Sequence, residues 1–327
     1  MSLTHLLPGI RRSALMVFVC TGWLGTPAQA QSCSAPWPTV RPVFHSQVEY
    51  GDPVRKSDPH IAVTIQGKPA KMLLDTGSNV HVIWDARLLV ASGAPSANDE
   101  EMLNAIASTT RAKKTRLLLD DTTGNRSVQP FYVIDETPLL ADGFSGIISP
   151  QYLAQDNVSI LNFRDDCFFV SVRFDPEDGG RYRTQTVGTV PNPHRVMAIP
   201  LDVPGGRVPV VVDSGAYRTT LVGSLLHRAT LGRQRSSNVD LLGNAVAVER
   251  RTRLVDIAIN GRRAPRHPVV PASEISEKGV VSLGAVGMDL LAGLVIFHDG
   301  DRDRFTFVET RGHADTARSC ARCMPIP

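Results

Sequence analysis

The sequence has few aromatic residues, few cysteines and little net charge. Phenylalanine, tryptophan and tyrosine make up 6% of its 327 residues, and there are five cysteines. The formal net charge is +3, from 35 basic and 32 acidic residues, so no charge imbalance points to a nucleic-acid partner. After residue 30 no apolar stretch is long enough to span a bilayer as a helix. We therefore expect no nucleic-acid binding and no stable membrane insertion once a leader has been removed.

Several catalytic motifs are also missing. The sequence has no G-x-S-x-G nucleophile elbow, no phosphate-binding P-loop and no H-E-x-x-H pair among its nine histidines. His81 alternates with apolar neighbours and has no evident partner, so we interpret it as a packed or surface histidine rather than a catalytic base. No cofactor and no metal are expected.

Residues 1–30 have the pattern of a secretory signal. A basic region ends in Arg11-Arg12, an apolar stretch follows over residues 14–24, and Ala28-Gln29-Ala30 has the small residues of a cleavage site. The alternative, an uncleaved anchor, agrees less well with this ending and with so short an apolar stretch. We expect an exported protein, periplasmic or secreted.

Four cysteines are left when residues 1–30 are removed: Cys33, Cys167, Cys320 and Cys323. An even number in an oxidising compartment predicts disulfide bonds, and all three connectivities remain open. The Cys320-x-x-Cys323 spacing also occurs in metal and redox sites. Since no second such pair and no paired histidines accompany it, a structural staple of the tail is the favoured interpretation.

One short pattern occurs twice. The apolar residues 72–74 precede Asp75-Thr76-Gly77-Ser78, and the apolar residues 210–212 precede Asp213-Ser214-Gly215-Ala216. Each copy predicts a buried strand that ends in a turn, because an unpaired carboxylate is costly to bury and glycine permits a tight turn and the close approach of another chain segment. The repeat predicts that the two aspartates meet.

Further landmarks follow each copy in the same order. Gly146 lies 71 residues after Asp75 and Gly287 lies 74 residues after Asp213, while Phe169 and Phe307, in two aromatic closing strands, each lie 94 residues after the respective aspartate. Equal order at nearly equal spacing indicates an internal duplication. The chain is therefore expected to form two similar lobes.

These paired motifs resemble those of the aspartic peptidases over residues 61–308. Two copies in one chain are similar to the pepsin-like layout, whereas the short lobes, the Asp-Ser-Gly-Ala motif and residues 286–291 look more like retropepsin subunits. The resemblance implies a mostly β fold with two homologous β-barrel-like lobes, an active-site cleft between them, and catalytic residues Asp75 and Asp213. It also implies a peptide or protein substrate. A monomer is expected, because the partner lobe is already present in the chain.

The resemblance also implies supporting residues and flaps. The residues expected to support the dyad are Thr76, Gly77, Ser78, Ser214 and Gly215. The candidate flap residues are Ala105, Ile106, Ala107 and Ser108 in the first lobe and Gly243 and Asn244 in a predicted hairpin turn of the second. The first of these segments has no tyrosine, unlike the pepsin flap, so small residues as in retropepsins are the better analogy.

Two carboxyl groups held together cannot both ionise easily, so the pair is expected to share one proton. The ionised aspartate then takes a proton from water while the other donates a hydrogen bond to the substrate carbonyl. Ser78 is expected to hydrogen-bond Asp75, which Ala216 cannot do for Asp213. This difference favours earlier ionisation of Asp75.

The expected organisation assigns residues 1–30 to the signal, 31–59 to a Pro-rich leader, 60–175 to the N-terminal lobe, 176–195 to a linker, 196–310 to the C-terminal lobe and 311–327 to a Cys-containing tail. The leader is either a cap strand or an inhibitory propeptide.

Two other functions remain open. A single Asp-Thr-Gly would be read as an ordinary turn, but two copies favour an aspartic endopeptidase. The main alternative is a catalytically inactive homologue that binds peptides or an envelope partner in its cleft. A glycosidase with paired carboxylates is a weaker alternative, since its chemistry does not require symmetric glycine turns.

Overall fold

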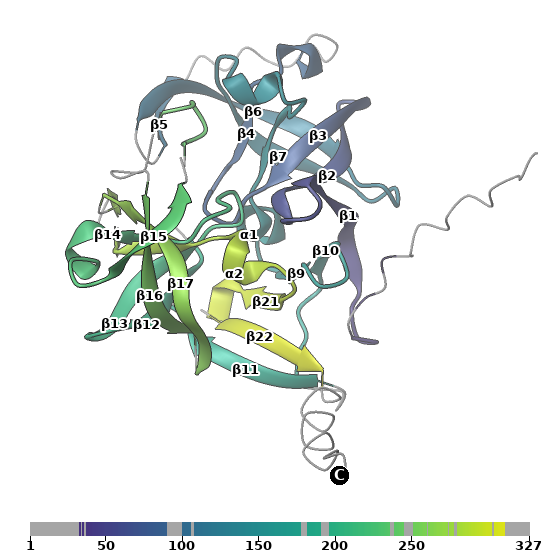
Figure 1. Cartoon of the computed structure of the whole chain (residues 1–327). Coiled ribbons are helices and arrows are strands. Elements are labelled where there is room, and N and C mark those ends of the chain that lie inside the picture. Colours follow the sequence, from purple (N-terminus) through teal and green to yellow (C-terminus); the bar gives the residue numbers. More distant parts are fainter. Residues whose placement is uncertain are drawn as a thin grey trace, which may run out of the picture. The chain divides into compact units, whose positions relative to one another are not determined.

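The structure is a computed structural model (Figure 1) that describes residues 33, 35, 37–89, 100–105, 108–177, 182–190, 196–235, 239–244, 251–259, 261–273, 275–277, 280–302 and 304–310. The expected signal, residues 1–30, and the tail with Cys320 and Cys323 lie outside these ranges. Within the described ranges no helix is long and apolar enough to cross a membrane.

The described chain is mostly β-structure. A first barrel is built from β2 (Ser57–Ile65), β3 (Lys68–Leu74), β4 (His81–Ile83), β6 (Thr109–Asp120), β7 (Arg126–Val133) and β8 (Gly146–Ile148), with β5 (Glu100–Asn104) beside β6. A second is built from β12 (Ala198–Val203), β13 (Gly206–Val212), β14 (Thr220–Val222), β16 (Arg251–Ile259), β17 (Arg262–Ala272) and β20 (Gly284–Val286), with β15 (Thr230–Arg235) beside β16. The short hairpin β18 (Ile275–Glu277) and β19 (Val280–Ser282) forms a sheet of its own.

The two barrels have the same strand order and the same strand directions. The second runs β12, β13, β20, β14, β17, β16 and closes by the β12–β16 pairing. The first runs β2, β3, β8, β4, β7, β6 and returns to β2 by the β2–β6 pairing. In each, the third strand is parallel to the second, and the fifth is parallel to the fourth. The same strand topology therefore occurs in both halves of the chain.

The strand register corrects one of the landmarks by which the sequence aligns the two halves of the chain. Leu74 pairs with Ile148 and Val212 pairs with Val286, so equivalent residues lie 138 positions apart. Gly146 therefore corresponds to Gly284, not to Gly287 as expected. Both are required to be glycine, because a Cβ at either position would collide with a carbonyl oxygen of the adjacent strand.

The expected equivalence of Phe169 and Phe307 is also wrong. Phe168 and Val170 face the main core together with Phe305 and Phe307, whereas Phe169 faces a smaller cluster around Trp37. Side chains alternate along a strand, so Phe169 and Phe307 do not occupy equivalent positions.

An antiparallel sheet joins the two barrels. Its strands run in the order β11 (Tyr182–Gly188), β22 (Arg304–Thr310), β21 (Val295–Asp299), β9 (Val158–Asn162), β10 (Cys167–Ser171) and β1 (Pro42–Asp52). The β9–β21 pairing connects the two halves, and Ile160 lies opposite Phe297. β11 lies inside residues 176–195, which were expected to be a linker, and β1 lies inside the expected leader. Because β1 is hydrogen-bonded to both β2 and β10, removal of residues 31–59 as a propeptide would remove the strand that connects this sheet to the first barrel.

The core follows from strand alternation. On β3, Met72 and Leu74 point into the first barrel, and Leu73 points outward. Two short helices, α1 (Pro150–Ala154) and α2 (Met288–Leu291), follow β8 and β20. Four 3-10 turns complete the described elements: Ala86–Leu88, Pro138–Leu140, Gly223–Leu225 and Gly300–Arg302.

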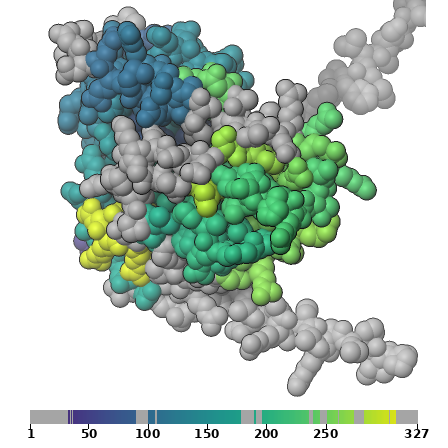
Figure 2. Space-filling model, turned by 90° about the vertical axis from the view of Figure 1, so that its left-hand side faces the viewer, coloured from purple at the N-terminus to yellow at the C-terminus, as the bar shows by residue number. Residues whose placement is uncertain are grey.

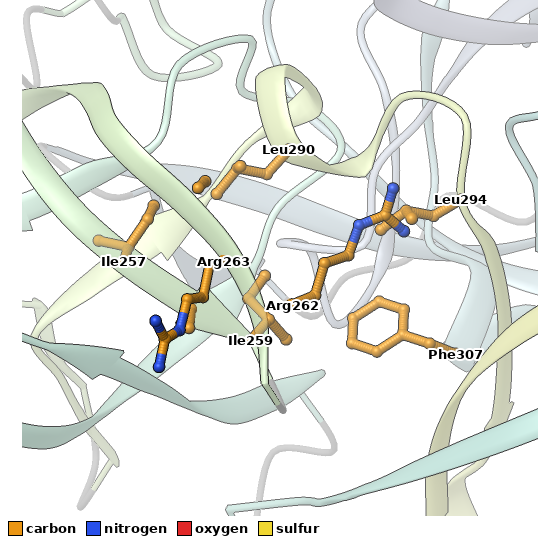
Figure 3. Close-up of a pocket in the computed structure, with 9 residues that line it drawn as sticks. Ile257, Ile259, Arg262, Arg263, Leu290, Leu294 and Phe307 are labelled. Carbon is orange, nitrogen blue, oxygen red and sulfur yellow. The ribbon is translucent and has the colours of Figure 1, made fainter. Parts of the chain in front are cut away.

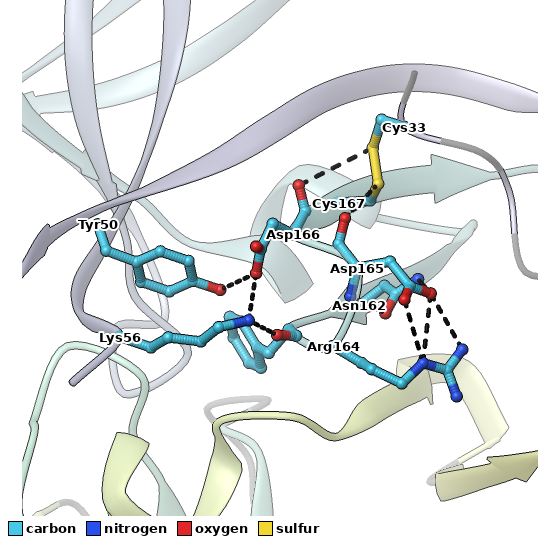
Figure 4. Close-up of polar contacts among 9 residues, drawn as sticks. Cys33, Tyr50, Lys56, Asn162, Arg164, Asp165, Asp166 and Cys167 are labelled. Carbon is cyan, nitrogen blue, oxygen red and sulfur yellow. Dashed lines mark hydrogen bonds and ion pairs between the residues drawn. A yellow bond between two sulfur atoms is a disulfide. The ribbon is translucent and has the colours of Figure 1, made fainter. Parts of the chain in front are cut away.

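A disulfide bond and a polar cluster attach Cys33, Tyr50 and Lys56 to the chain segment that leads from β9 into β10 (Figure 4). Cys33 is bonded to Cys167, which confirms that a disulfide forms. Beside it, Asp166 accepts hydrogen bonds from the Tyr50 hydroxyl at 2.8 Å and the Lys56 ammonium at 2.6 Å. Of the three possible connectivities, only the one that pairs Cys320 with Cys323 is compatible with this bond.

Candidate active site

The two repeated aspartates meet at the ends of β3 and β13. The Asp75 N–H donates to the Ile148 carbonyl at 3.0 Å, and the Asp213 N–H donates to the Val286 carbonyl at 2.9 Å. The two carboxyl groups hydrogen-bond to each other. Asp213 is only 6% exposed, while Asp75 is half-buried. The fold thus brings together two carboxyl groups 138 residues apart in sequence.

Each glycine of the repeat lies against the opposite aspartate. A Cβ placed on Gly77 would lie 2.8 Å from Cγ of Asp213, and a Cβ placed on Gly215 would lie 2.8 Å from Cγ of Asp75. Real Cβ atoms do not approach carbon so closely, so any side chain at either position would push the carboxyl groups apart. Glycine at these positions is what lets the two turns meet.

The two hydroxyl residues between aspartate and glycine exchange hydrogen bonds across the interface. The Thr76 N–H donates to Ser214 Oγ at 3.0 Å, and the Ser214 N–H donates to Thr76 Oγ1 at 2.9 Å. The hydroxyls themselves donate across the interface, Thr76 to the Val212 carbonyl and Ser214 to the Leu74 carbonyl, both at 2.6 Å. Both side chains are fully buried, so each hydroxyl is a donor and an acceptor that water does not reach.

Burial raises the pKa of both carboxyl groups. Burial is the main cause of the raised pKa of Asp213, and the charge of Asp75 raises it further. Burial also raises the pKa of Asp75, but hydrogen bonds from the Gly77 N–H, from Asp213 and from the Ser78 N–H oppose this effect. These hydrogen bonds favour ionisation of Asp75, and burial together with the charge of Asp75 favours retention of the shared proton on Asp213.

The expected cause of this difference, a hydrogen bond from the Ser78 side chain, is not present. The Ser78 hydroxyl donates to the Val80 carbonyl at 2.8 Å, so it is the Ser78 backbone that supports Asp75. In the second half the Ala216 N–H donates to Asp213 Oδ1 at 3.0 Å. The Ser78 and Ala216 side chains therefore do not make the difference that the sequence comparison assigned to them.

A second set of side chains positions the two aspartate turns, and the alignment of the two halves by sequence missed it. The Ser149 N–H donates to His81 Nδ1, and the Gly287 N–H donates to Thr219 Oγ1, each at 3.1 Å. His81 and Thr219 are 138 residues apart, as are Ser149 and Gly287. His81 is fully buried, which lowers its pKa to about 3 and keeps it neutral, so its interpretation as a packed histidine is correct.

The second residue of each short helix also holds its turn in place. The Gln151 amide donates to the carbonyls of Thr76 at 2.9 Å and Ser78 at 2.7 Å. At the equivalent position Asp289 accepts hydrogen bonds from the Thr219 N–H and hydroxyl, and it lies 3.1 Å from His267 Nε2. Equivalent residues of the two halves lie 138 positions apart in the sequence. Extending this spacing beyond the Asp-Thr/Ser-Gly motif would have identified these residues.

The candidate flap residues are only partly described. Ala105 and Ser108 exchange backbone hydrogen bonds at the end of the β5–β6 hairpin, while Ile106 and Ala107 lie outside the described residues. Gly243 and Asn244 belong to a turn, residues 240–244, between β15 and β16. Ser108 donates from its hydroxyl to Asp240 of this turn at 2.5 Å. The two candidate flap segments are therefore in contact.

A pocket is lined by residues of β16 and β17 together with residues of α2 and of the joining sheet (Figure 3). It is lined by Ile257, Ala258, Ile259, Arg262, Arg263, Ala264, Leu290, Leu294 and Phe307. It contains neither aspartate. Among the described residues no group of three or more histidines, cysteines or acids is placed to hold a metal ion.

No protein-family model matches the chain, and no curated protein matches its sequence.

Proposed function

We propose that the chain is an exported aspartic endopeptidase that hydrolyses peptide bonds with a water molecule activated between Asp75 and Asp213. The observation that supports this proposal most is the reciprocal geometry of the two turns. Each glycine lies against the opposite carboxyl group, and Thr76 and Ser214 bond across the interface in both directions. An ordinary Asp-Thr-Gly turn satisfies its own backbone and requires no such partner.

In the proposed mechanism the pair acts with one proton. Ionised Asp75 removes a proton from a bound water, and protonated Asp213 donates a hydrogen bond to the carbonyl oxygen of the substrate. Attack of the water on the carbonyl carbon gives a tetrahedral intermediate with no covalent bond to the enzyme. The leaving nitrogen then takes a proton from the pair, the C–N bond breaks, and one shared proton remains. The low exposure of Asp213 strengthens these electrostatic interactions.

The remaining parts of the proposal rest on the sequence. Residues 1–30 support export to the periplasm or to the medium, and the presence of both lobes in one chain supports a monomer. Peptides or unfolded proteins are the proposed substrates.

Digestion of a denatured-peptide library from pH 3 to 8 tests the proposal. We expect cleavage that a statine-type transition-state inhibitor blocks and that Asp75→Asn abolishes. The matched control is Asp142→Asn, which removes an exposed carboxylate outside the dyad and should leave cleavage intact. Absence of cleavage by the folded wild-type protein at every pH would favour the inactive, peptide-binding homologue instead.

A further inference from the structure

The pocket at the end of the β16–β17 hairpin has an apolar lining. Side chains of the hairpin, of α2 with the residues that follow it, and of β22 enclose an open space of about 490 Å³, the solvent at its mouth included. Seven of the lining residues are apolar: Ile257, Ala258, Ile259, Ala264, Leu290, Leu294 and Phe307. Of the described residues that line it, Arg262 and Arg263 alone have polar side chains. A ligand in this pocket would therefore contact mostly carbon.

The end of this hairpin is open to solvent. Figure 2 shows light-green atoms of the hairpin at the surface of the molecule, and Gly261, Arg262 and Arg263 are exposed. Behind them the side chains of Ile259 and Phe307 are each only 7% exposed. The pocket thus leads from an exposed, basic end to a buried, apolar one.

Arg262 lies on the same face of the hairpin as the apolar side chains. It is paired with Ile259 across the two strands, and directly opposed residues of an antiparallel pair share one face. Arg263 lies on the other face, because side chains alternate along a strand. In Figure 3 Arg262 extends toward Leu294 and Phe307, whereas Arg263 points away from them. One cation therefore stands over the pocket.

The guanidinium of Arg262 has no acidic partner within the described part of the chain. Two other hairpin arginines do have one. Arg126, at the start of β7, lies opposite Asp120, with 2.5 Å between its Nε and Oδ1 of the acid. Arg207 lies opposite Asp202 in the β12–β13 hairpin, with 2.7 Å between the same atoms. Arg262 lies opposite an isoleucine instead, so its charge is available to an anion from outside.

The apolar lining and the unpaired guanidinium together select a ligand by its chemistry. A guanidinium offers a carboxylate two parallel N–H groups, and these charge-assisted bonds are stronger than neutral hydrogen bonds. Further polar groups on the ligand would lose water in the pocket without gaining a side-chain partner. A lipid-bilayer surface is recognised by several cations on one face, whereas Arg263 faces away from Arg262. A free aliphatic monocarboxylate agrees best with these features.

We infer that this pocket binds the anion of a medium-chain fatty acid, with the aliphatic chain against Leu290 and Phe307 and the carboxylate on the guanidinium of Arg262. The inference goes beyond the proposed function and does not depend on it, because the lining contains neither Asp75 nor Asp213.

Isothermal titration calorimetry on the full chain tests this site with three probes. Octanoate has both the chain and the charge, octanol has the chain without the charge, and butanoate has the charge with a shorter chain. Octanoate should bind at least about tenfold more tightly than either of the others. Arg262→Gln should weaken octanoate binding by about tenfold and leave octanol binding unchanged, because only the charged contact is lost. Leu290→Ala should weaken both.

The matched control is Arg263→Gln, which removes the same charge from the other face of the hairpin and should not change octanoate affinity. Failure of the wild type to bind octanoate would overturn the inference, as would equal losses in the two arginine variants. Unchanged octanoate binding by Arg262→Gln would show that this arginine only covers apolar surface with its methylene stem. Sedimentation with phosphatidylglycerol vesicles that requires Arg262, without octanoate binding, would assign the site to a membrane surface instead. None of these results bears on peptide cleavage, so the proposed function is tested separately.

Discussion

Gly215 lies against the carboxyl group of Asp75, close enough that a Cβ would be 3.0 Å from both carboxylate oxygens. Gly215→Ala should therefore displace Asp75 from its partner. We expect kcat/KM to fall by about 100-fold or more, since a displacement of about 1 Å in a catalytic group has effects of this size. Gly223→Ala is the matched control, because a Cβ there meets nothing within 4 Å. Equal activity of the two variants would show that the close approach is not needed.

The buried exchange between Thr76 and Ser214 predicts a loss of stability. Thr76→Val keeps the shape of the side chain but leaves the Ser214 N–H without its acceptor. The free energy of unfolding should fall by about 1–3 kcal/mol, the usual cost of an unsatisfied buried group. Urea unfolding followed by circular dichroism measures this change. Thr122→Val, at an exposed position, should be within about 0.5 kcal/mol of wild type.

The raised pKa of Asp213 predicts how stability depends on pH. Burial and the charge of Asp75 raise this pKa from 3.8 to about 8, so between these values the unfolded chain has lost a proton that the folded protein retains. Stability therefore decreases as pH rises through this window. Asp213→Asn removes the effect and should raise Tm at pH 8 by a few degrees or more, with little change at pH 3.5. An equal shift of Tm at both pH values would contradict the assigned ionisation.

The disulfide prediction concerns connectivity. Peptide mapping of the exported protein without reduction should recover Cys33 linked to Cys167. Because the bond joins residues 134 apart, replacing both cysteines by serine should lower the free energy of unfolding by about 2–4 kcal/mol. Recovery of Cys33 linked to Cys320 or Cys323 would contradict the structure.

The repeated motif allowed much of the site to be predicted, because local sequence specifies a strand that ends in an acid and a glycine. The comparison found Asp75 and Asp213 and the residues that follow them. It failed at Gly287, since a single glycine gives no register. Only the pairing of Leu74 with Ile148 and of Val212 with Val286 shows that Gly146 corresponds to Gly284. The sequence alone also leaves the alignment of the two closing strands uncertain by one residue. For this reason Phe169 was wrongly matched with Phe307.

Other features depend on contacts that no local pattern encodes. β11 has a polar sequence, and its strand forms by pairing with β22, which follows more than a hundred residues later. Leu241 and Leu242 meet the first half only through the tertiary fold, so they read as part of a hairpin in the sequence. His81 and Thr219 differ in chemistry but perform the same task, and motif comparison therefore did not pair them.

The most direct test of the central claim compares Asp75→Asn, Asp213→Asn and the double variant on one peptide cleaved by the wild type. If the two carboxyl groups act as one unit, all three variants should lose kcat by about the same large factor, while Asp142→Asn keeps wild-type activity. Retained cleavage in either single variant, or losses that multiply in the double variant, would contradict a shared catalytic pair.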